Sequence, residues 1–425
     1  MRISRVAVAT MAVAAMAIAG CSSSGGAASS PSGTSGSAAS GSASASGSGS
    51  ASASASGSGS ASASASGSGS AASGSAASCT LPDPVKVGVV FTLTGGGAQY
   101  GATQKNGVQL AADQLNAKGG VKYDLNIQDS QTDNKQAISI FESMIDAGDS
   151  VIIGPTLSDA AKQTDPIAQQ AKVPVLGVSN TAAGITSIGD YIFRDSLTES
   201  AVIPQTIKAA KAKYNLKKVV VMYANDDAFS EGGYDAFKQA LSDQGITTAK
   251  TLTFSKNDTD FRSLLTEAKG ENPDALVVSS LIDAAVPIVT QARQLGMKMP
   301  IIGGNGFNSP ALMKDAGSAA NGVVVGAAWN SASDNPLSQQ FIKDYTAKYG
   351  SAPDQFATQA YTGMLVVDNA VRSACSADRD AIKDALGKTK DLPTPLGNLT
   401  LDSNRDAVHD AVVQIVQDGK FAVLK

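Results

Sequence analysis

The stretch from residue 151 to residue 184 reads VIIGPTLSDAAKQTDPIAQQAKVPVLGVSNTAAG, and it contains one pattern twice. The apolar run VII ends in Gly-Pro and is followed by the hydroxyl side chains of Thr156 and Ser158. The apolar run VPVLGV ends at Ser179, and Thr181 follows two residues later. Short apolar runs that are bounded by small polar residues indicate buried strands. A connecting segment with helical spacing of apolar residues indicates that such strands run parallel. The stretch therefore predicts two strand ends that carry small hydroxyl side chains.

The same alternation of strand and helix signals extends in both directions from this stretch. It runs over residues 85–178 and starts again over 203–327, and a strand hairpin is expected around Gly419. Such an order predicts an α/β fold with parallel sheets covered by helices on both faces. The folded part is longer than one core usually holds, so we expect two doubly wound lobes. Ligands bind at the carboxyl ends of strands in such sheets, which places a ligand between the lobes.

The first residues have the pattern of an export signal. Arg2 and Arg5 are followed by an apolar run that is short for a membrane-spanning helix, and residues 1–20 end in Ala-Gly. Cys21 comes next, in an arrangement that resembles the lipobox of bacterial lipoproteins. We expect Cys21 to be acylated and to anchor the chain to the membrane. The alternative is a plain secretory signal followed by a chance cysteine.

Residues 22–78 consist almost only of Ser, Gly and Ala, with GSGSASASAS at 47–56 and again at 57–66. No apolar face is available for burial, so the sequence from Cys21 to residue 78 is predicted to be a disordered tether. Its expected reach is on the order of 40 Å.

Composition excludes several classes of function. The net charge is −4 and no basic patch with interleaved aromatic residues is present, so nucleic acid is not an expected partner. His409 is the single histidine, and the sequence lacks G-x-S-x-G, H-E-x-x-H and C-x-x-C motifs. The glycines at 95–97 lack the residues of a phosphate-binding loop. We expect a protein that is not an enzyme and that holds no cofactor and no metal.

Two cysteines remain besides Cys21. Cys79 opens the folded region, and Cys375 follows a predicted long helix from Phe356 to Ala374. In an oxidising exterior two cysteines favour one disulfide, so we predict that they pair. The alternative is two free thiols.

Several stretches together resemble the type I periplasmic solute-binding proteins, in the branch of leucine/isoleucine/valine-binding proteins of ABC importers. They are VKVGVVFTLTGGGAQYGATQKNGVQLAADQLNAKGGV at 85–121, VIIGPTLSDAA at 151–161, VPVLGVSNTAAGIT at 173–186, DYIFRDS at 190–196, PDALVVSSLIDAAVPIVTQARQLGM at 273–297 and IIGGNGF at 301–307. The resemblance implies two lobes joined by three crossovers that close on a ligand like a hinge. Lobe 1 would be residues 79–198 plus 332–390, and lobe 2 would be 199–331 plus 391–425.

The resemblance also gives the hydroxyls a role. In this family the first lobe holds a ligand carboxylate with hydroxyls and backbone N–H groups at the two strand ends. Ser158 and Thr181 match the hydroxyl positions, and Ser179 would offer backbone atoms. Ser158 is expected to begin a helix, whose free N–H groups and dipole favour an anion. The alternative is that Ser158 and Thr181 only cap helices.

Three aromatic residues match positions that pack on the ligand in the family. Tyr100 is expected in the loop after the first strand, Phe229 in lobe 2, and Phe356 at the start of its helix in lobe 1. Buried aromatic rings supply much of the apolar contact in small-ligand pockets. The alternative for each is ordinary core packing.

The sequence departs from the family where the ligand ammonium is held. An acidic residue usual in lobe 2 is replaced by Asn305, and a frequent tyrosine is replaced by Leu281. Asparagine does not neutralise a buried ammonium, and an unpaired buried charge is costly. Asp226, Asp227 and Asp283 lie in nearby predicted loops and are candidate substitutes, although each fits a turn or cap equally well.

We therefore expect a monomeric, lipid-anchored binding protein on the outer face of the cell membrane that delivers a small solute to an ABC permease. The solute is expected to be apolar and to carry a carboxylate. A branched-chain or other apolar amino acid is one interpretation. A non-amino organic acid or amide is an equal alternative, because of Asn305 and Leu281. A ligand sensor that signals to a membrane receptor is a further alternative.

Overall fold

The structure, a computed structural model, describes residues 79–425, which belong to one compact unit. The predicted export signal, the acylated Cys21 and the predicted tether lie outside the described residues. Among the helices of residues 79–425, none combines the length and apolarity needed to cross a membrane.

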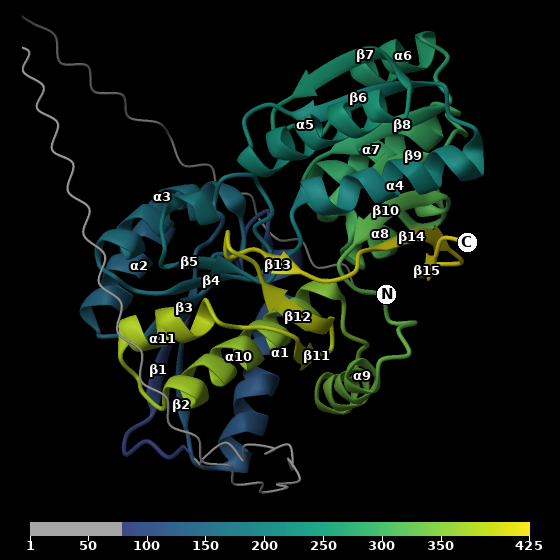
Figure 1. The fold of residues 1–425 in the computed structure, drawn as a ribbon. Helices are drawn as coiled ribbons and strands as arrows, with labels where there is room; N and C mark the ends of the chain where they lie inside the picture. The colour runs from purple at the N-terminus through teal and green to yellow at the C-terminus, as the bar shows by residue number, and fades with distance from the viewer. Residues whose placement is uncertain (1–78) are drawn as a thin grey trace, which may run out of the picture. The chain divides into compact units, whose positions relative to one another are not determined.

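The first sheet has five parallel strands in the order β2-β1-β3-β4-β5 (Figure 1). The strands are β1 (Val85–Phe91), β2 (Tyr123–Asp129), β3 (Val151–Ile153), β4 (Val175–Gly177) and β5 (Ile192–Arg194). β3 and β4 are the two apolar runs of the stretch 151–184. Their neighbouring positions in the sheet bring the two polar strand ends side by side.

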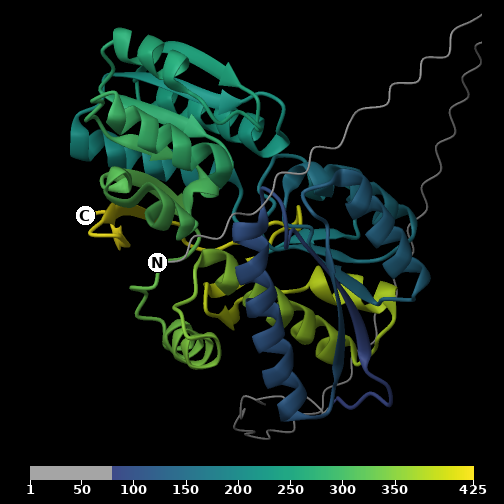
Figure 2. The same ribbon diagram turned by 180° about the vertical axis from the view of Figure 1, so that it is seen from behind.

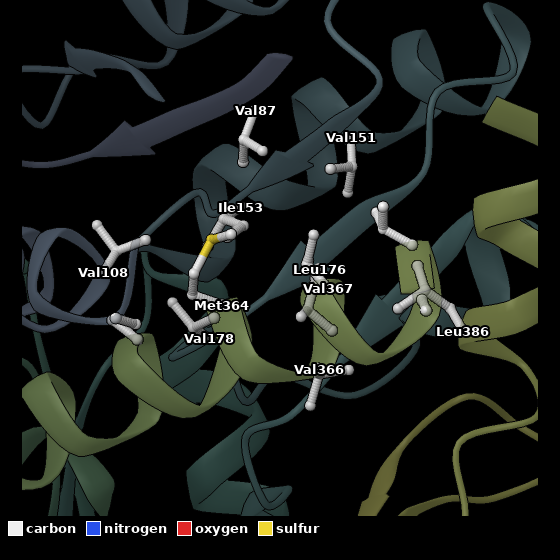
Figure 3. Packing of buried hydrophobic residues seen from close by; sticks show 14 of the residues in the cluster. Val87, Val108, Val151, Ile153, Leu176, Val178, Met364, Val366, Val367 and Leu386 are labelled. Carbon is white, nitrogen blue, oxygen red and sulfur yellow. The ribbon is translucent and has the colours of Figure 1, made fainter. Parts of the chain in front are cut away.

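Helices cover both faces of this sheet, as its apolar strands predict. Their bounds are α1 (Ala98–Lys118), α2 (Asn134–Asp146), α3 (Ser158–Gln170), α10 (Gln355–Ala374) and α11 (Arg379–Leu386). Val87 and Val89 of β1 pack with α1, α10 and α11, whereas Val90 packs with α2 and α3. Figure 3 shows the first of these two layers, in which Met364 of α10 lies among side chains of the strands.

The most extensive helix contact of this lobe is between α1 and α10, which lie side by side in Figure 2. The approach depends on Gly107, because a Cβ atom there would lie 2.1 Å from the backbone oxygen of Ala357. The helix α9 (Pro336–Tyr349) packs beside them through Phe341 and Tyr345.

The second sheet has seven strands in the order β15-β14-β10-β9-β8-β6-β7. The five neighbouring strands β10, β9, β8, β6 and β7 are parallel to one another. At the β10 edge, β14 and β15 add an antiparallel hairpin. The strands are β6 (Lys218–Ala224), β7 (Thr247–Phe254), β8 (Ala275–Ser279), β9 (Ile301–Gly303), β10 (Val323–Ala327), β14 (Val412–Gln417) and β15 (Lys420–Val423).

Two helical layers cover this sheet as well. The helices are α4 (Glu199–Tyr214), α5 (Ala228–Asp243), α6 (Arg262–Gly270), α7 (Ile282–Gln294) and α8 (Ala311–Ala316), with the 3-10 turns η2 (Asn305–Phe307) and η3 (Gly317–Ala320). Val219 and Val221 of β6 face α4 and α5, whereas Val220 and Met222 face α6, α7 and α8. The alternation of a strand's side chains thus assigns each helix to a face.

A small third sheet follows α11, with β11 (Leu392–Thr394), β12 (Gly397–Leu401) and β13 (Ala407–Val408). Leu399 and Leu401 belong to the core of the first sheet. The division into two lobes stays a proposal, and this packing favours placing residues 391–408 with lobe 1. The chain then passes between lobes three times, from β5 to α4, from β10 to α9 and from β13 to β14.

One helix start differs from that expected from the sequence. α1 begins at Ala98, so Tyr100 lies in the first helical turn and the prediction that it sits in a loop is wrong. α5 begins at Ala228 and continues through the glycines at 232 and 233. The terminal hairpin around Gly419 is confirmed as β14 and β15.

Cys79 and Cys375 form the predicted disulfide, with their Cα atoms 5.5 Å apart. The bond joins the residues before β1 to the end of α10, across a separation of 296 residues. A cross-link over so long a segment restricts the unfolded chain strongly.

We expect the double variant Cys79→Ala/Cys375→Ala to lose about 2–5 kcal/mol in free energy of unfolding in urea. Reductant should lower the stability of the wild-type protein to the same extent and leave that of the variant unchanged. A variant as stable as the wild type would contradict a structural role for the bond.

Candidate ligand-binding site

A small cavity lies where the strand ends of lobe 1 face lobe 2. The residues that line it come from both lobes: Tyr100, Thr156, Leu157, Ser158, Ser179, Asp227, Phe229, Leu281, Asn305, Gly306 and Phe356. Six of the seven predicted ligand-binding residues are in this lining, and Thr181 is not.

Ser158 is the first residue of α3, as predicted. The residue before it, Leu157, supplies no side-chain cap to the helix. The first N–H groups of a helix have no partners within the helix, and they favour negative charge. The Ser158 hydroxyl is not a cap either, because its Oγ accepts from the Ala182 N–H at 3.3 Å. The helix end that faces the cavity is therefore open to an anion.

A buried glutamine fixes the two strand ends relative to each other. The Gln104 side chain, in α1, donates to Ser179 Oγ at 2.7 Å and accepts from Thr156 Oγ1 at 2.7 Å. Ser179 Oγ in turn donates to the Thr156 backbone oxygen at 2.7 Å. Because the Ser179 hydroxyl is used in this network, backbone atoms are what this residue has left for a ligand.

Thr181 is buried and does not line the cavity. Its hydroxyl donates to Glu199 Oε1 at 3.0 Å, so it does not cap a helix. Glu199 is in the first turn of α4 and is 4% exposed. Burial raises the pKa of Glu199 to about 7, while the hydrogen bond from Thr181 and the nearby Asn305 N–H oppose the rise.

The three predicted aromatic residues form an apolar wall. The rings of Tyr100 and Phe356 pack with their centroids 4.6 Å apart, and Phe229 lies on the lobe 2 side. The Tyr100 hydroxyl donates to the Gly306 backbone oxygen at 2.8 Å and accepts from the Ile282 N–H at 2.7 Å. Tyr100 therefore links lobe 1 to the start of α7 in lobe 2. Burial raises the pKa of its hydroxyl well above the usual range.

Asn305 begins the turn η2 and is oriented by its neighbours. Its amide oxygen accepts from Gln355 Nε2 at 2.6 Å and from Asn308 Nδ2 at 3.2 Å. With the oxygen occupied, Asn305 presents its NH₂ group as a donor. An amide in this state does not receive a ligand ammonium.

Among the three acids proposed as substitutes, Asp227 alone lines the cavity. Asp227 also caps α5, through bonds from the Ser230 N–H and hydroxyl. Burial, together with the charge of Asp159, raises the pKa of Asp227. Asp226 instead holds Ser255 and the Lys256 N–H in a turn, and Asp283 is exposed and lies outside the lining.

The cavity lining contains one carboxylate and no lysine, arginine or histidine. A bound carboxylate would be received by neutral donors, chiefly the N–H groups at the start of α3. In residues 79–425, no group of three or more His, Cys, Asp or Glu side chains is arranged to hold a metal ion.

The family model described as periplasmic binding protein matches residues 84–420. The chain belongs to the periplasmic binding protein family. Its α/β architecture with two parallel sheets is the type I fold of that family, as predicted. Because the family consists of binding proteins, the prediction that the chain is not an enzyme is confirmed.

Relatives within the periplasmic binding protein family include solute-binding proteins of ABC transporters. The Leu/Ile/Val-binding protein BraC3 of Rhizobium johnstonii is 29% identical, with 76% of this chain and 88% of the relative covered. The substrate binding protein LivJ from Streptococcus pneumoniae was solved in complex with isoleucine and is 30% identical to this chain. Its TM-score is 0.76, and the match covers 80% of this chain and 99% of LivJ. The chain is thus a solute-binding protein of an ABC transporter.

A third relative carries a different ligand. A solute binding protein of an ABC transporter from Rhodopseudomonas palustris BisB5 was solved in complex with 3,4-dihydroxy benzoic acid. It is 25% identical, with a TM-score of 0.72 and coverage of 80% of this chain and 95% of that one.

The sequence did not reveal three supporting residues, Gln104, Glu199 and Arg194. Arg194 is 2% exposed and donates to the backbone oxygens on either side of Thr181, at 2.7 Å to Ala182 and 3.3 Å to Asn180. Gln104 and Glu199 read as ordinary polar residues of helices. A charged residue inside the apolar run YIFR was the one signal that marked Arg194.

Proposed function

We propose that this protein is the extracytoplasmic solute receptor of an ABC importer and that it binds a branched-chain or other apolar amino acid. The ligand carboxylate lies at the start of α3, against Ser158 and the backbone at Ser179. The apolar side chain packs against Tyr100, Phe229 and Phe356. The two lobes close around the solute by a hinge motion at the three crossovers. The permease then recognises the closed, solute-bound state.

The observation that carries this proposal is the open helix end at Ser158 inside a cavity without basic side chains. Such an end binds a carboxylate with neutral donors, and the aromatic wall selects an apolar remainder. The names of the relatives from Rhizobium johnstonii and Streptococcus pneumoniae agree with this class of ligand.

Two buried acids favour an amino acid over a solute without an ammonium group. Asp227 lines the cavity, and Glu199 is buried beside the backbone of Asn305, which also lines it. A buried carboxylate without a cationic partner is costly, and a ligand ammonium supplies that partner. The replacement of the usual acid by Asn305 therefore does not leave the site without negative charge.

The membrane attachment is part of the same proposal. Cys21, acylated after removal of the export signal, anchors the protein, and the Ser/Gly/Ala segment lets the binding domain reach the permease. Mass spectrometry of the protein from membranes would detect the acyl groups on Cys21. An unmodified N-terminus there would contradict the anchor and leave the proposed ligand site unaffected.

We expect Ser158→Ala to weaken the binding of leucine about tenfold or more, because a hydrogen bond to a charged group contributes about 1.5–3 kcal/mol. Calorimetric titration of the protein freed of bound solute measures this. The matched control is Ser242→Ala, on the exposed side of α5, which should bind as the wild type does. Equal affinities for Ser158→Ala and wild type would contradict the assigned carboxylate position.

A second candidate ligand is an aromatic acid. The NH₂ group of Asn305 suits a hydroxyl or carboxyl oxygen, and one relative was solved with 3,4-dihydroxy benzoic acid. Titration with 3,4-dihydroxybenzoate beside leucine distinguishes the two candidates. Tight binding of the aromatic acid without a response to any apolar amino acid would replace the first proposal by the second.

A further inference from the structure

Glu199 lies at the first crossover, where the chain leaves lobe 1 after β5 and enters α4. Its carboxyl is held between elements of both lobes. Thr181, from the loop after β4, donates to Oε1 at 3.0 Å. On the lobe 2 side, a Cβ atom built on Gly304 would lie 3.1 Å from Oε2, so the carboxyl sits against the backbone that leads to Asn305.

One oxygen of this carboxyl has no partner. Oε2 of Glu199 is buried and accepts no hydrogen bond from any residue that the structure describes. Buried polar groups are normally satisfied, and an unsatisfied one calls for a specific reason. Of the two neighbours of the carboxyl, Asn305 lines the cavity, and Thr181 follows two residues after Ser179, which also lines it.

We propose that Glu199 provides the negative charge that selects ligands with an ammonium group, acting from behind the cavity wall through the Thr181 hydroxyl. This inference rests on the proposed function. The Thr181 hydroxyl donates a hydrogen bond to Glu199. The lone pairs of the Thr181 oxygen are then available to accept a hydrogen bond from the ligand ammonium. Glu199 is a positioning residue, because Thr181 stands between it and the ligand.

Asp227 fits this role less well than Glu199. Its capping contacts tie it to the start of α5, and the next residue, Ala228, donates to Asp159 at the start of α3 at 2.8 Å. Asp227 is thus near the helix end that is expected to receive the ligand carboxylate. Glu199 instead neighbours Thr181 and Asn305, which are not at this helix end.

The charge state of Glu199 predicts a pH dependence. The described groups that face its carboxyl are neutral: the Thr181 hydroxyl, the Asn305 N–H and the glycines at 233 and 304. Burial raises the pKa of Glu199 to about 7 without ligand. An adjacent ammonium favours the ionised form, so binding lowers this pKa and releases a proton. Affinity for an ammonium-bearing ligand should therefore rise as the pH rises through 7.

Asp227, Asp283 and Asp354 are further carboxyl groups near the cavity whose pKa values are raised by burial. Burial raises the pKa of Asp354, which caps α10 and bonds to Thr103, to about 6. A variant at Glu199 separates its titration from theirs. Glu199→Gln keeps the size of the side chain and an oxygen to accept from Thr181, and it removes the charge.

The test is calorimetric titration of wild type and Glu199→Gln with leucine and with 4-methylpentanoate, which is leucine without its amino group. Titrations span about pH 5.5–8.5 in buffers of different ionisation enthalpy, which reports the protons released. We expect Glu199→Gln to bind leucine about 10–100-fold more weakly at pH 8, a loss of the size found for one hydrogen bond to a charged group. For 4-methylpentanoate, we expect the affinities of wild type and Glu199→Gln to differ by less than about threefold. Its binding to wild type should release no proton near pH 7, because it has no ammonium group.

The outcomes separate this inference from the proposed function. If wild type binds leucine and Glu199→Gln keeps both its affinity and its pH profile, the inference is overturned and the proposed function stands. If wild type binds no amino acid, the proposed function itself fails. Thr181→Val provides a second variant: it removes the hydroxyl between Glu199 and the ligand, and it should lose leucine affinity while Thr181→Ser retains it.

Discussion

Replacing Arg194 by methionine is expected to lower the free energy of unfolding by about 3 kcal/mol, because it breaks a partly buried ion pair and removes a donor to buried backbone oxygens. Arg194 is the largest fully buried side chain of the described residues. Its Nε is 2.5 Å from Asp406 Oδ1, and its Nη1 holds the backbone oxygens of Asn180 and Ala182. Methionine fills much of the space but leaves the Asp406 carboxylate and the Ala182 backbone oxygen without their donor, whereas the Asn180 oxygen keeps the Ser196 hydroxyl.

The same substitution should also weaken ligand binding more than about tenfold, since the loop that carries Thr181 loses the contacts that fix it. Urea unfolding and calorimetric titration measure the two effects. The control is Arg262→Met, which breaks an exposed pair with Asp260 and should cost about 0–1 kcal/mol without a change in affinity. Equal stabilities of the two variants would show that Arg194 does not hold this loop.

Replacing Gly107 by alanine is expected to cost about 3 kcal/mol or more in free energy of unfolding, although alanine is the better helix former. The added methyl group would lie 2.1 Å from the Ala357 backbone oxygen, so α1 and α10 must separate. These helices carry Tyr100 and Phe356, whose rings pack against each other beside the cavity. A looser helix pair should therefore weaken binding as well.

Gly270→Ala is the matched control for this effect. Gly270 ends α6, and a Cβ atom built there meets nothing within 4 Å. This variant should be neutral or up to about 1 kcal/mol more stable, because alanine restricts the unfolded chain more than glycine does. If Gly107→Ala were as stable as Gly270→Ala in urea unfolding, the close contact of α1 and α10 would not limit the fold.

The main elements of the fold were predictable because they depend on local patterns. The apolar runs of β1, β3, β6, β8 and β9 are buried on both faces, and such runs are readable in a sequence. The short strands β11 and β13 were not predicted, since each depends on pairing with a neighbour rather than on its own pattern. The start of α1 was misplaced because three glycines precede it.

The candidate site was predictable in one half and not in the other. The strand ends of lobe 1 carry their polar residues within a short segment, so the positions of Ser158 and Ser179 followed from the pattern. Glu199 follows Thr198, which caps α4, and an acid in a first helical turn is ordinary. Its burial against Thr181 and Gly304 arises from segments far apart in the chain, which no local pattern reveals.

The most direct test of the account is calorimetric titration of the wild-type protein, freed of bound solute, with leucine and leucinamide at pH 8. The two ligands share the side chain and differ in the carboxylate, which leucinamide lacks. The account predicts that leucine binds at least about 100-fold more tightly, since the open end of α3 receives the carboxylate. Equal binding of leucinamide would contradict the carboxylate site at Ser158 and with it the central claim.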